Sequence, residues 1–181
     1  MTYVDDYITG LENTLKAVSR SEVQAVVDFL FDALFEDRQV FIIGNGGSAS
    51  IASHVSVDFA KVARVRSSTF NNANLITCFA NDYGYENWVV EAIKAYLNKN
   101  DMMILISSSG TSKNIVNAAK YCKKNSIQLI TLSGFKKNNP LSKYGNVNFH
   151  INSDQYNFIE MSHHIILVYL VDIFAKNKII S

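Results

Sequence analysis

The run Val40-Phe41-Ile42-Ile43-Gly44-Asn45-Gly46-Gly47-Ser48-Ala49-Ser50 decides how we expect this chain to fold. Four apolar residues end abruptly at a glycine-rich turn, and a helical pattern begins after the turn. This order is typical of a strand, a tight loop and the N-terminus of a helix. Because the free N–H groups and the dipole of a helix N-terminus attract anions, the loop predicts a phosphate site.

A second run, Met103-Ile104-Leu105-Ile106-Ser107-Ser108-Ser109-Gly110-Thr111-Ser112, has the same organisation with hydroxyl side chains in place of most glycines. Hydroxyl groups donate hydrogen bonds to phosphate oxygens, and the helix that follows adds its N–H groups. The alternative interpretation is an ordinary capped turn, which rarely needs so dense a hydroxyl cluster. Two such loops in one chain predict that it binds a phosphorylated small molecule.

The remaining apolar pattern predicts strands and helices that alternate along the chain. Two helices between Val4 and Phe35 come first. The predicted strands are Val40 to Ile43, Asn74 to Cys78, Met102 to Ile106, Gln128 to Leu132 and Val147 to Ile151. The later helices are Ser48 to Val62, Trp88 to Leu97, Ser112 to Lys124 and Tyr156 to Ala175. We therefore expect an α/β fold, a three-layer α/β/α sandwich with a five-stranded parallel sheet that binds ligands at the carboxyl ends of its strands.

Length and composition limit the classes of protein that the chain can belong to. Its 181 residues, 48% of them hydrophobic, suit a single domain spanning residues 1–181. A net charge of +1 argues against a direct nucleic-acid partner. We find no signal peptide and no segment as long as a membrane span, so we expect a soluble cytoplasmic protein without a membrane partner. The cysteines, Cys78 and Cys122, lie in apolar contexts and are expected to be buried free thiols.

The helices at the two ends of the chain carry more apolar surface than a small sheet can bury. The helical pair at residues 1–36 has an apolar stripe, and the closing helix contains the unbroken apolar run 165–171. We therefore predict a homo-oligomer assembled through these helices. The alternative is a monomer with one bulky core.

The stretch from Gly44 to Ala49 also fits the dinucleotide-binding pattern G-x-G-x-x-G/A, although a lone match is weak. That pattern requires an acidic residue near the end of the next strand to bind the ribose. The predicted second strand ends at Thr77-Cys78 with no acid in the run from Asn71. We therefore expect no nucleotide cofactor.

Three segments together resemble the sugar isomerase (SIS) domain family. Gly44 to Ser50 resembles its first loop, and Ser107 to Asn114 resembles its phosphate-binding serine loop. The segment Ala80-Asn81-Asp82-Tyr83-Gly84 resembles a segment of one branch, the phosphoheptose isomerases. The resemblance implies a homotetramer with active sites between subunits and a phosphorylated sugar as substrate. It assigns the phosphate to Ser48, Ser107, Ser108, Ser109 and Ser112, and other substrate contacts to Asn45, Gly46 and Asp82, although Asp82 also suits a plain helix-capping turn.

Phosphoheptose isomerases interconvert a ketose phosphate and an aldose phosphate, which requires a base and an acid. The family carries H-x-x-x-E after the first loop and Q-x-x-H-x-x-x-x-H on the closing helix. In this chain the first pattern becomes His54 and Asp58, and Glu160 replaces the glutamine. His163 matches the inner histidine, whereas Val168 stands where the family has its catalytic histidine. Valine cannot transfer a proton.

Two substitutes for the missing histidine remain open. His164 lies midway between Glu160 and Val168 on one helical stripe and can serve as the acid or as a metal ligand. Alternatively, Glu160 takes a proton role beside Asp58, because neighbouring carboxyl groups split their pKa values. Asp58, Glu160 and His164 are thus the catalytic candidates. His54, Asp58, Glu160 and His164 form a candidate zinc set of mixed nitrogen and oxygen ligands. The competing interpretation makes the histidines packing residues at helix interfaces.

The sequence leads to one main functional hypothesis and two alternatives. The main hypothesis is an aldose–ketose isomerase of a phosphorylated sugar, similar to sedoheptulose 7-phosphate isomerase, that supplies precursors for surface polysaccharide or lipopolysaccharide. Val168 favours a non-catalytic tetrameric adaptor of the kind that binds a replication initiator. The third candidate is a sensor that binds a sugar phosphate without converting it.

Overall fold

The computed structural model describes residues 2–176 and contains a five-stranded parallel sheet in the order β2-β1-β3-β4-β5. Its strands are β1 (Val40–Ile43), β2 (Ser67–Ser68), β3 (Met102–Ile106), β4 (Gln128–Ser133) and β5 (Val147–His150). Every residue of β1 and β3 is buried. Such unbroken apolar strands are typical of a parallel sheet that is covered on both faces.

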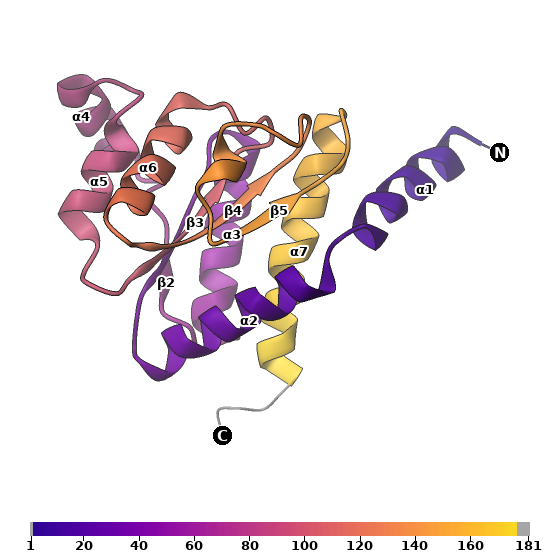
Figure 1. Cartoon of the computed structure of the whole chain (residues 1–181), viewed down its shortest axis with the longest axis horizontal. Coiled ribbons are helices and arrows are strands. Elements are labelled where there is room, and N and C mark those ends of the chain that lie inside the picture. Colours follow the sequence, from indigo (N-terminus) through magenta and orange to yellow (C-terminus); the bar gives the residue numbers. More distant parts are fainter. Residues whose placement is uncertain (1, 177–181) are drawn as a thin grey trace.

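Helices cover both faces of the sheet, as Figure 1 shows. They are α1 (Tyr3–Lys16), α2 (Arg20–Phe35), α3 (Gly47–Lys61), α4 (Ala73–Tyr83), α5 (Trp88–Tyr96), α6 (Lys113–Lys124) and α7 (Tyr156–Lys176), with a short 3-10 turn, η1 (Leu141–Lys143). Alternate strand residues face opposite layers: Ile42 and Ile104 pack with α2, α3 and α7, whereas Phe41 and Met103 pack with α5 and α6. The predicted α/β/α sandwich is therefore confirmed.

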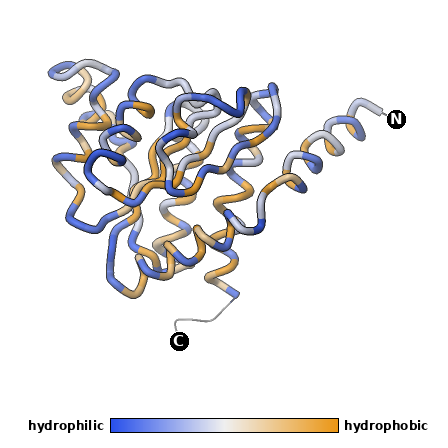
Figure 2. Tube along the Cα trace, viewed as in Figure 1, coloured by the Kyte–Doolittle hydropathy of each residue, from blue (hydrophilic) through white to orange (hydrophobic). Residues whose placement is uncertain are grey.

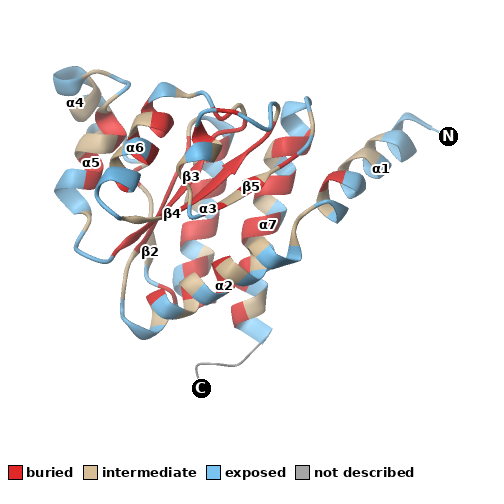
Figure 3. Ribbon diagram, in the orientation of Figure 1, coloured by how far each residue is buried: buried red, intermediate tan, exposed pale blue. Residues whose placement is uncertain are grey.

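The two cores occupy the spaces between the sheet and its helices. Figure 3 shows the buried residues concentrated on the strands and on the inward sides of the helices, and Figure 2 shows hydrophobic residues along the same strands. Trp88 and Phe59 are among the largest fully buried side chains. These two layers hold the strand ends, and hence the loops that follow them, in fixed positions.

The leading helical pair forms as predicted and is defined by its caps. Thr2 and Asp5 form a capping box at the start of α1, and Ser19 caps α2. In Figure 1, α1 projects away from the sheet. It contacts the rest of the chain through α7, where Thr14 and Ser162 share a buried hydroxyl hydrogen bond of 2.7 Å.

The predicted strand from Asn74 to Cys78 is wrong, because this segment belongs to α4. The side chain of Asn72 accepts hydrogen bonds from the backbone N–H groups of Asn74 and Leu75 and so starts a helix. Leu75, Ile76, Phe79 and Ala80 then pack at helical spacing against the core beside α5. A short apolar run fits both periods, and the cap decides between them. The second strand is instead the two-residue β2, which pairs with β1.

The helical form of this segment also changes one of the cysteine predictions. Cys78 lies on α4 and is exposed, so the expectation that it is buried is wrong. Cys122 on α6 is buried as expected, and burial raises the pKa of its thiol to about 12.

Helix α7 corrects the expectation that no segment reaches the length of a membrane span. With 21 residues it is long and apolar enough to cross a membrane by length and composition alone. Nine of its residues, among them Ile166 and Leu170, are buried inside the fold. The apolar composition is therefore that of a helix packed against a sheet.

Candidate functional site

The predicted site residues gather at the carboxyl ends of two neighbouring strands. Strand β1 lies beside β3 in the sheet, so the loops that follow them meet at one edge. Together with the first turn of α7 they enclose a small pocket of about 130 Å³. Its lining residues are Asn45, Ser48, Ile106, Ser107, Ser108, Ser109, Ser112, Tyr156 and Glu160. Seven of the nine are predicted site residues.

The loop after β1 is shaped by its glycines. Gly46 starts α3 with a φ of +54°, a backbone conformation that glycine adopts without strain. A Cβ atom on Gly47 would lie 2.5 Å from Oε2 of Glu160, so the glycine permits this carboxylate to approach the helix N-terminus closely. The position suits a negative charge, because the first N–H groups of α3 carry no intrahelical acceptors.

Asn45 holds this loop against the second loop. Its side-chain amide exchanges two hydrogen bonds of 2.9 Å with the buried amide of Asn114 on α6. The hydroxyl of Tyr85 also donates to Oδ1 of Asn45 at 3.3 Å. Asn45 therefore positions the pocket as well as lining it. Asn114 and Tyr85 were missed as site residues, although Asn114 ends the serine segment that carries the family resemblance.

The serine loop presents hydroxyl groups around the start of α6. Ser112 is the N-cap residue of α6, yet its side chain makes no capping hydrogen bond. It instead accepts a bond of 3.2 Å from the hydroxyl of Ser107, which is buried. Ser109 is paired with Thr111 at the rim of the loop. Hydroxyls and free helix N–H groups thus converge in one place, which is the arrangement that binds a phosphate.

Glu160 is the one charged side chain that lines this pocket. It comes from the first part of α7, and its Oε1 accepts a long hydrogen bond of 3.4 Å from the hydroxyl of Ser108. A carboxylate at this position lies beside any ligand held by the serines. It can therefore accept a proton from such a ligand or bind its hydroxyl groups.

Three further predicted residues form a row between α3 and α7. Nε2 of His54 lies 3.1 Å from Oδ2 of Asp58, and Nδ1 of His54 lies 2.8 Å from Nε2 of His164. The two imidazole rings meet at 86°. Partial burial lowers the pKa of His164, the neighbouring His54 lowers it further, and Asp58 raises it.

This geometry does not fit the candidate zinc set of His54, Asp58, Glu160 and His164. The two nitrogens of an imidazole ring point in divergent directions, so Asp58 and His164 lie on different sides of the His54 ring. One ion cannot contact all three in this arrangement, and Glu160 faces Ser108 instead. Within residues 2–176 there is no group of three or more His, Cys, Asp or Glu side chains placed to hold a metal ion.

Three other residues singled out in the sequence lie away from the pocket. Asp82 is exposed near the end of α4, where its carboxylate accepts a bond from Asn81. Val168, which also lies on α7, is partly buried and packs against the hydrophobic core. His163 is fully buried, and its Nε2 donates to the carbonyl oxygen of Ser133 at 3.2 Å, which makes it a packing residue between α7 and β4. Burial lowers the pKa of His163 to about 4.

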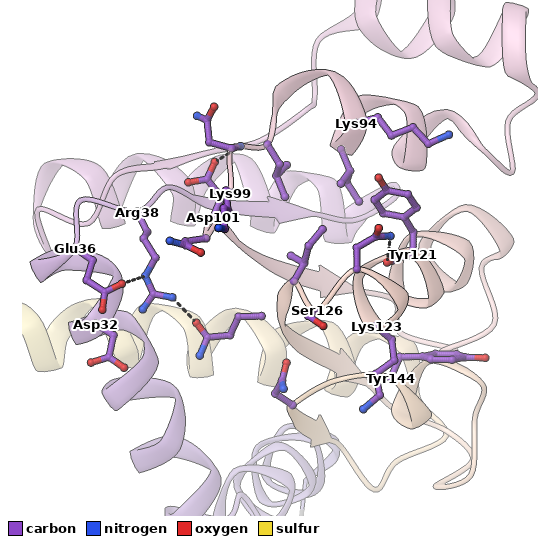
Figure 4. A pocket seen from close by; sticks show the side chains of 18 residues that line it. Asp32, Glu36, Arg38, Lys94, Lys99, Asp101, Tyr121, Lys123, Ser126 and Tyr144 are labelled. Atoms are coloured by element: carbon purple, nitrogen blue, oxygen red, sulfur yellow. Dashed lines mark hydrogen bonds and ion pairs between the residues drawn. The ribbon is translucent and has the colours of Figure 1, made fainter.

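A larger cavity of about 960 Å³ lies at the opposite edge of the sheet, where the strands begin (Figure 4). Its charged groups are of both signs and several are paired: Arg38 lies 3.2 Å from Glu36, and Asp101 accepts two backbone hydrogen bonds. None of the residues of the glycine-rich loop or of the serine loop lines this cavity. The smaller pocket at the carboxyl ends is therefore the better candidate.

Comparisons with known proteins identify the family of the chain. The model of the SIS domain family matches residues 2–134, which include both loops. The chain is similar to phosphoheptose isomerase 2 of Campylobacter jejuni, with 32% identity over 72% of this chain and 66% of the relative. It is also similar to a phosphoheptose isomerase of Helicobacter pylori, with 34% identity over 69% and 68% of the two chains. These matches span about two thirds of the relatives' length.

Solved structures with the same fold include two phosphoheptose isomerases. The one from Francisella tularensis superimposes with a TM-score of 0.84 at 22% identity, and covers 97% of this chain and all of that one. The one from Neisseria gonorrhoeae gives a TM-score of 0.86 at 19% identity, with 96% and 97% coverage. The family match, the sequence relatives and the shared fold lead to one conclusion: this chain belongs to the SIS domain family.

Proposed function

We propose that the protein is a phosphosugar isomerase that interconverts a ketose phosphate and an aldose phosphate, with sedoheptulose 7-phosphate as the preferred substrate class. One observation carries this proposal. The serine loop, the N-terminus of α3 and the carboxylate of Glu160 line the same pocket. A phosphate site beside a proton acceptor is what this reaction needs, and the similarity to phosphoheptose isomerases supports the length of the sugar.

In this proposal the serine loop binds the phosphate end of the substrate. Ser107, Ser109 and Ser112 donate hydroxyl hydrogen bonds, and the first N–H groups of α6 add theirs. Because the pocket is only about 130 Å³, it holds the phosphate group and leaves the sugar outside. The sugar then extends past Glu160 along α7.

Glu160 acts as the base in this scheme. Its carboxylate takes a proton from the carbon next to the carbonyl group, and the electron pair left behind forms the carbon–carbon double bond of an enediol. Returning the proton to the neighbouring carbon gives the isomeric sugar. The close approach permitted by Gly47 fixes the carboxylate at the edge of the phosphate pocket, so that one binding event positions the reacting carbon.

Turnover of sedoheptulose 7-phosphate, followed by formation of the aldose, tests the proposal. We expect Glu160→Gln to lower kcat about 100-fold or more with little change in KM, because the amide keeps the shape but cannot accept the proton. Ser112→Ala should instead raise KM. Asp172→Asn, an exposed carboxylate-to-amide change on the same helix, is the matched control. Binding of the sugar phosphate without turnover would indicate a sensor, and the absence of both would indicate an adaptor.

We further propose that the protein works in the cytoplasm as a homotetramer and supplies heptose for surface polysaccharide or lipopolysaccharide. Exposed apolar side chains support the assembly. Tyr3, Val4 and Ile8 on α1 are 83%, 61% and 58% exposed, and an apolar groove between the helical pair and α7 contains Ile165 and Tyr169. Light scattering of the purified protein tests this, since a monomeric mass would contradict it.

A further inference from the structure

The row formed by Asp58, His54 and His164 between α3 and α7 can supply a proton transfer that the pocket alone cannot. Glu160 can move a proton between carbons, but isomerisation also moves a proton between two oxygens. Val168 stands at the position where the family resemblance requires the acid, and it packs against the core. The chain therefore needs another acid–base group near Glu160.

The contacts of the row fit one set of ring tautomers. Oδ2 of Asp58 can accept only a donated proton, so Nε2 of His54, 3.1 Å away, is the donor. In a neutral His54 the other nitrogen, Nδ1, is then an acceptor, and Nε2 of His164 donates to it at 2.8 Å. Among the described residues, Nδ1 of His164 has no hydrogen-bond partner. The row thus ends in one free imidazole nitrogen.

The end of the row also lies at the right place along α7. His164 follows Glu160 by four residues, so the two share a face of the helix and are separated by about 6 Å along its axis. A substrate whose phosphate is held by the serine loop passes Glu160 before it reaches His164. The titratable groups that act on His164 are His54 and Asp58 from α3, and Glu160 faces Ser108 one turn earlier on α7.

We propose that Asp58, His54 and His164 form a hydrogen-bonded row, named the relay, in which His164 alone exchanges protons with the sugar oxygens and so replaces the family's catalytic histidine. The inference rests on the proposed function. His164 begins the reaction as an imidazolium; when Glu160 takes the carbon-bound proton, His164 gives its Nδ1 proton to the carbonyl oxygen of the ketose. When the enediol collapses to the aldose, His164 takes the proton of the neighbouring hydroxyl and Glu160 returns its proton to carbon. Both groups end as they began. His54 is a positioning residue that holds Nε2 of His164, and Asp58 positions His54 and favours the protonated form of His164.

Side-chain substitutions and removal of metal ions distinguish the relay from a zinc site, because the two arrangements predict different changes in kcat. We expect His164→Gln to lower kcat for sedoheptulose 7-phosphate about 100-fold or more. Inhibition by inorganic phosphate should be unchanged, because the serine loop is intact. His54→Gln should lower kcat by about 10-fold to 100-fold, as loss of an orienting partner does. Dialysis against EDTA should leave the wild-type rate unchanged, and metal analysis should find no stoichiometric zinc.

Moving the histidine from position 164 to position 168 tests whether a loss of activity comes from the missing imidazole group or from a disturbed fold. Val168→His in the His164→Gln background restores the family's arrangement one helical turn away, so we expect it to recover activity at least about tenfold. Val168→Gln in the same background is the matched control and should recover nothing. An active wild-type protein that is unaffected by His164→Gln, or that loses its activity with its zinc, would overturn the relay and leave the proposed function standing. A wild-type protein that converts no ketose phosphate would overturn both.

Discussion

The burial of His163 predicts that the protein loses stability as the pH falls. This side chain is fully buried, and no described residue accepts or donates at its Nδ1. Burial lowers the pKa of His163, the bond to the carbonyl oxygen of Ser133 partly opposes this, and the nearby His150 lowers it slightly, so that the pKa is about 4. A proton added to His163 in the folded protein would therefore create a buried positive charge that water cannot solvate.

The sign and size of the effect follow from linkage. In the unfolded chain His163 has its ordinary pKa of 6.5, so between pH 6.5 and about 4 the unfolded state binds a proton that the folded state does not. The free energy of unfolding therefore falls as the pH falls through this window, and below about pH 4 this group has no further effect. The difference between 6.5 and about 4 corresponds to about 3 kcal/mol of stability.

Urea denaturation at several pH values measures this quantity. Trp88 is the single tryptophan and is buried, so its fluorescence reports unfolding. Because other groups also titrate, the test compares wild type with His163→Gln. The free energy of unfolding of this variant lacks the pH-dependent contribution of His163. The difference between the free energies of unfolding of the two proteins should change by about 3 kcal/mol between pH 7 and pH 4. Ser162→Ala, a buried neighbour that does not titrate, should follow wild type. Parallel profiles for wild type and His163→Gln would refute the reasoning.

Three further predictions concern the thiols and the loops. Cys78 is exposed and Cys122 is buried with a pKa of about 12, so one thiol should react with a disulfide reagent in the native protein and the second only in denaturant. Gly47→Ala places a Cβ against the flexible end of Glu160, so kcat should fall while the melting temperature changes little; a large loss of stability would contradict this. Gly110→Ala combines a φ of +64° with a Cβ 2.1 Å from the Asn139 side chain, and should cost about 1–3 kcal/mol of stability and weaken phosphate binding, which calorimetry measures.

Local patterns in the sequence were sufficient to predict four of the five strands and the meeting of the two loops at one edge of the sheet. Strands β1 and β3 are unbroken apolar runs, and each is followed by a loop whose residues indicate the N-terminus of a helix. Both signals depend on neighbours in the chain, and parallel strands bring their carboxyl ends to one edge in any sandwich of this class. The failure at Asn74 to Cys78 has the same origin, because a short apolar run does not distinguish a strand from a helix and the Asn72 cap does.

The arrangement of the acidic and imidazole groups was decided by tertiary structure. The sequence placed His54 and Asp58 on one helix face and Glu160 and His164 on another, and it left open a zinc shell, a carboxylate pair or packing histidines. Helical spacing already brings His54 to Asp58, but packing of α3 against α7 sets the rotation of the two helices, and that rotation brings His54 to His164 while Glu160 turns toward Ser108. Helical spacing fixes which residues share a face, but only the contact between two faces determines which side chains meet.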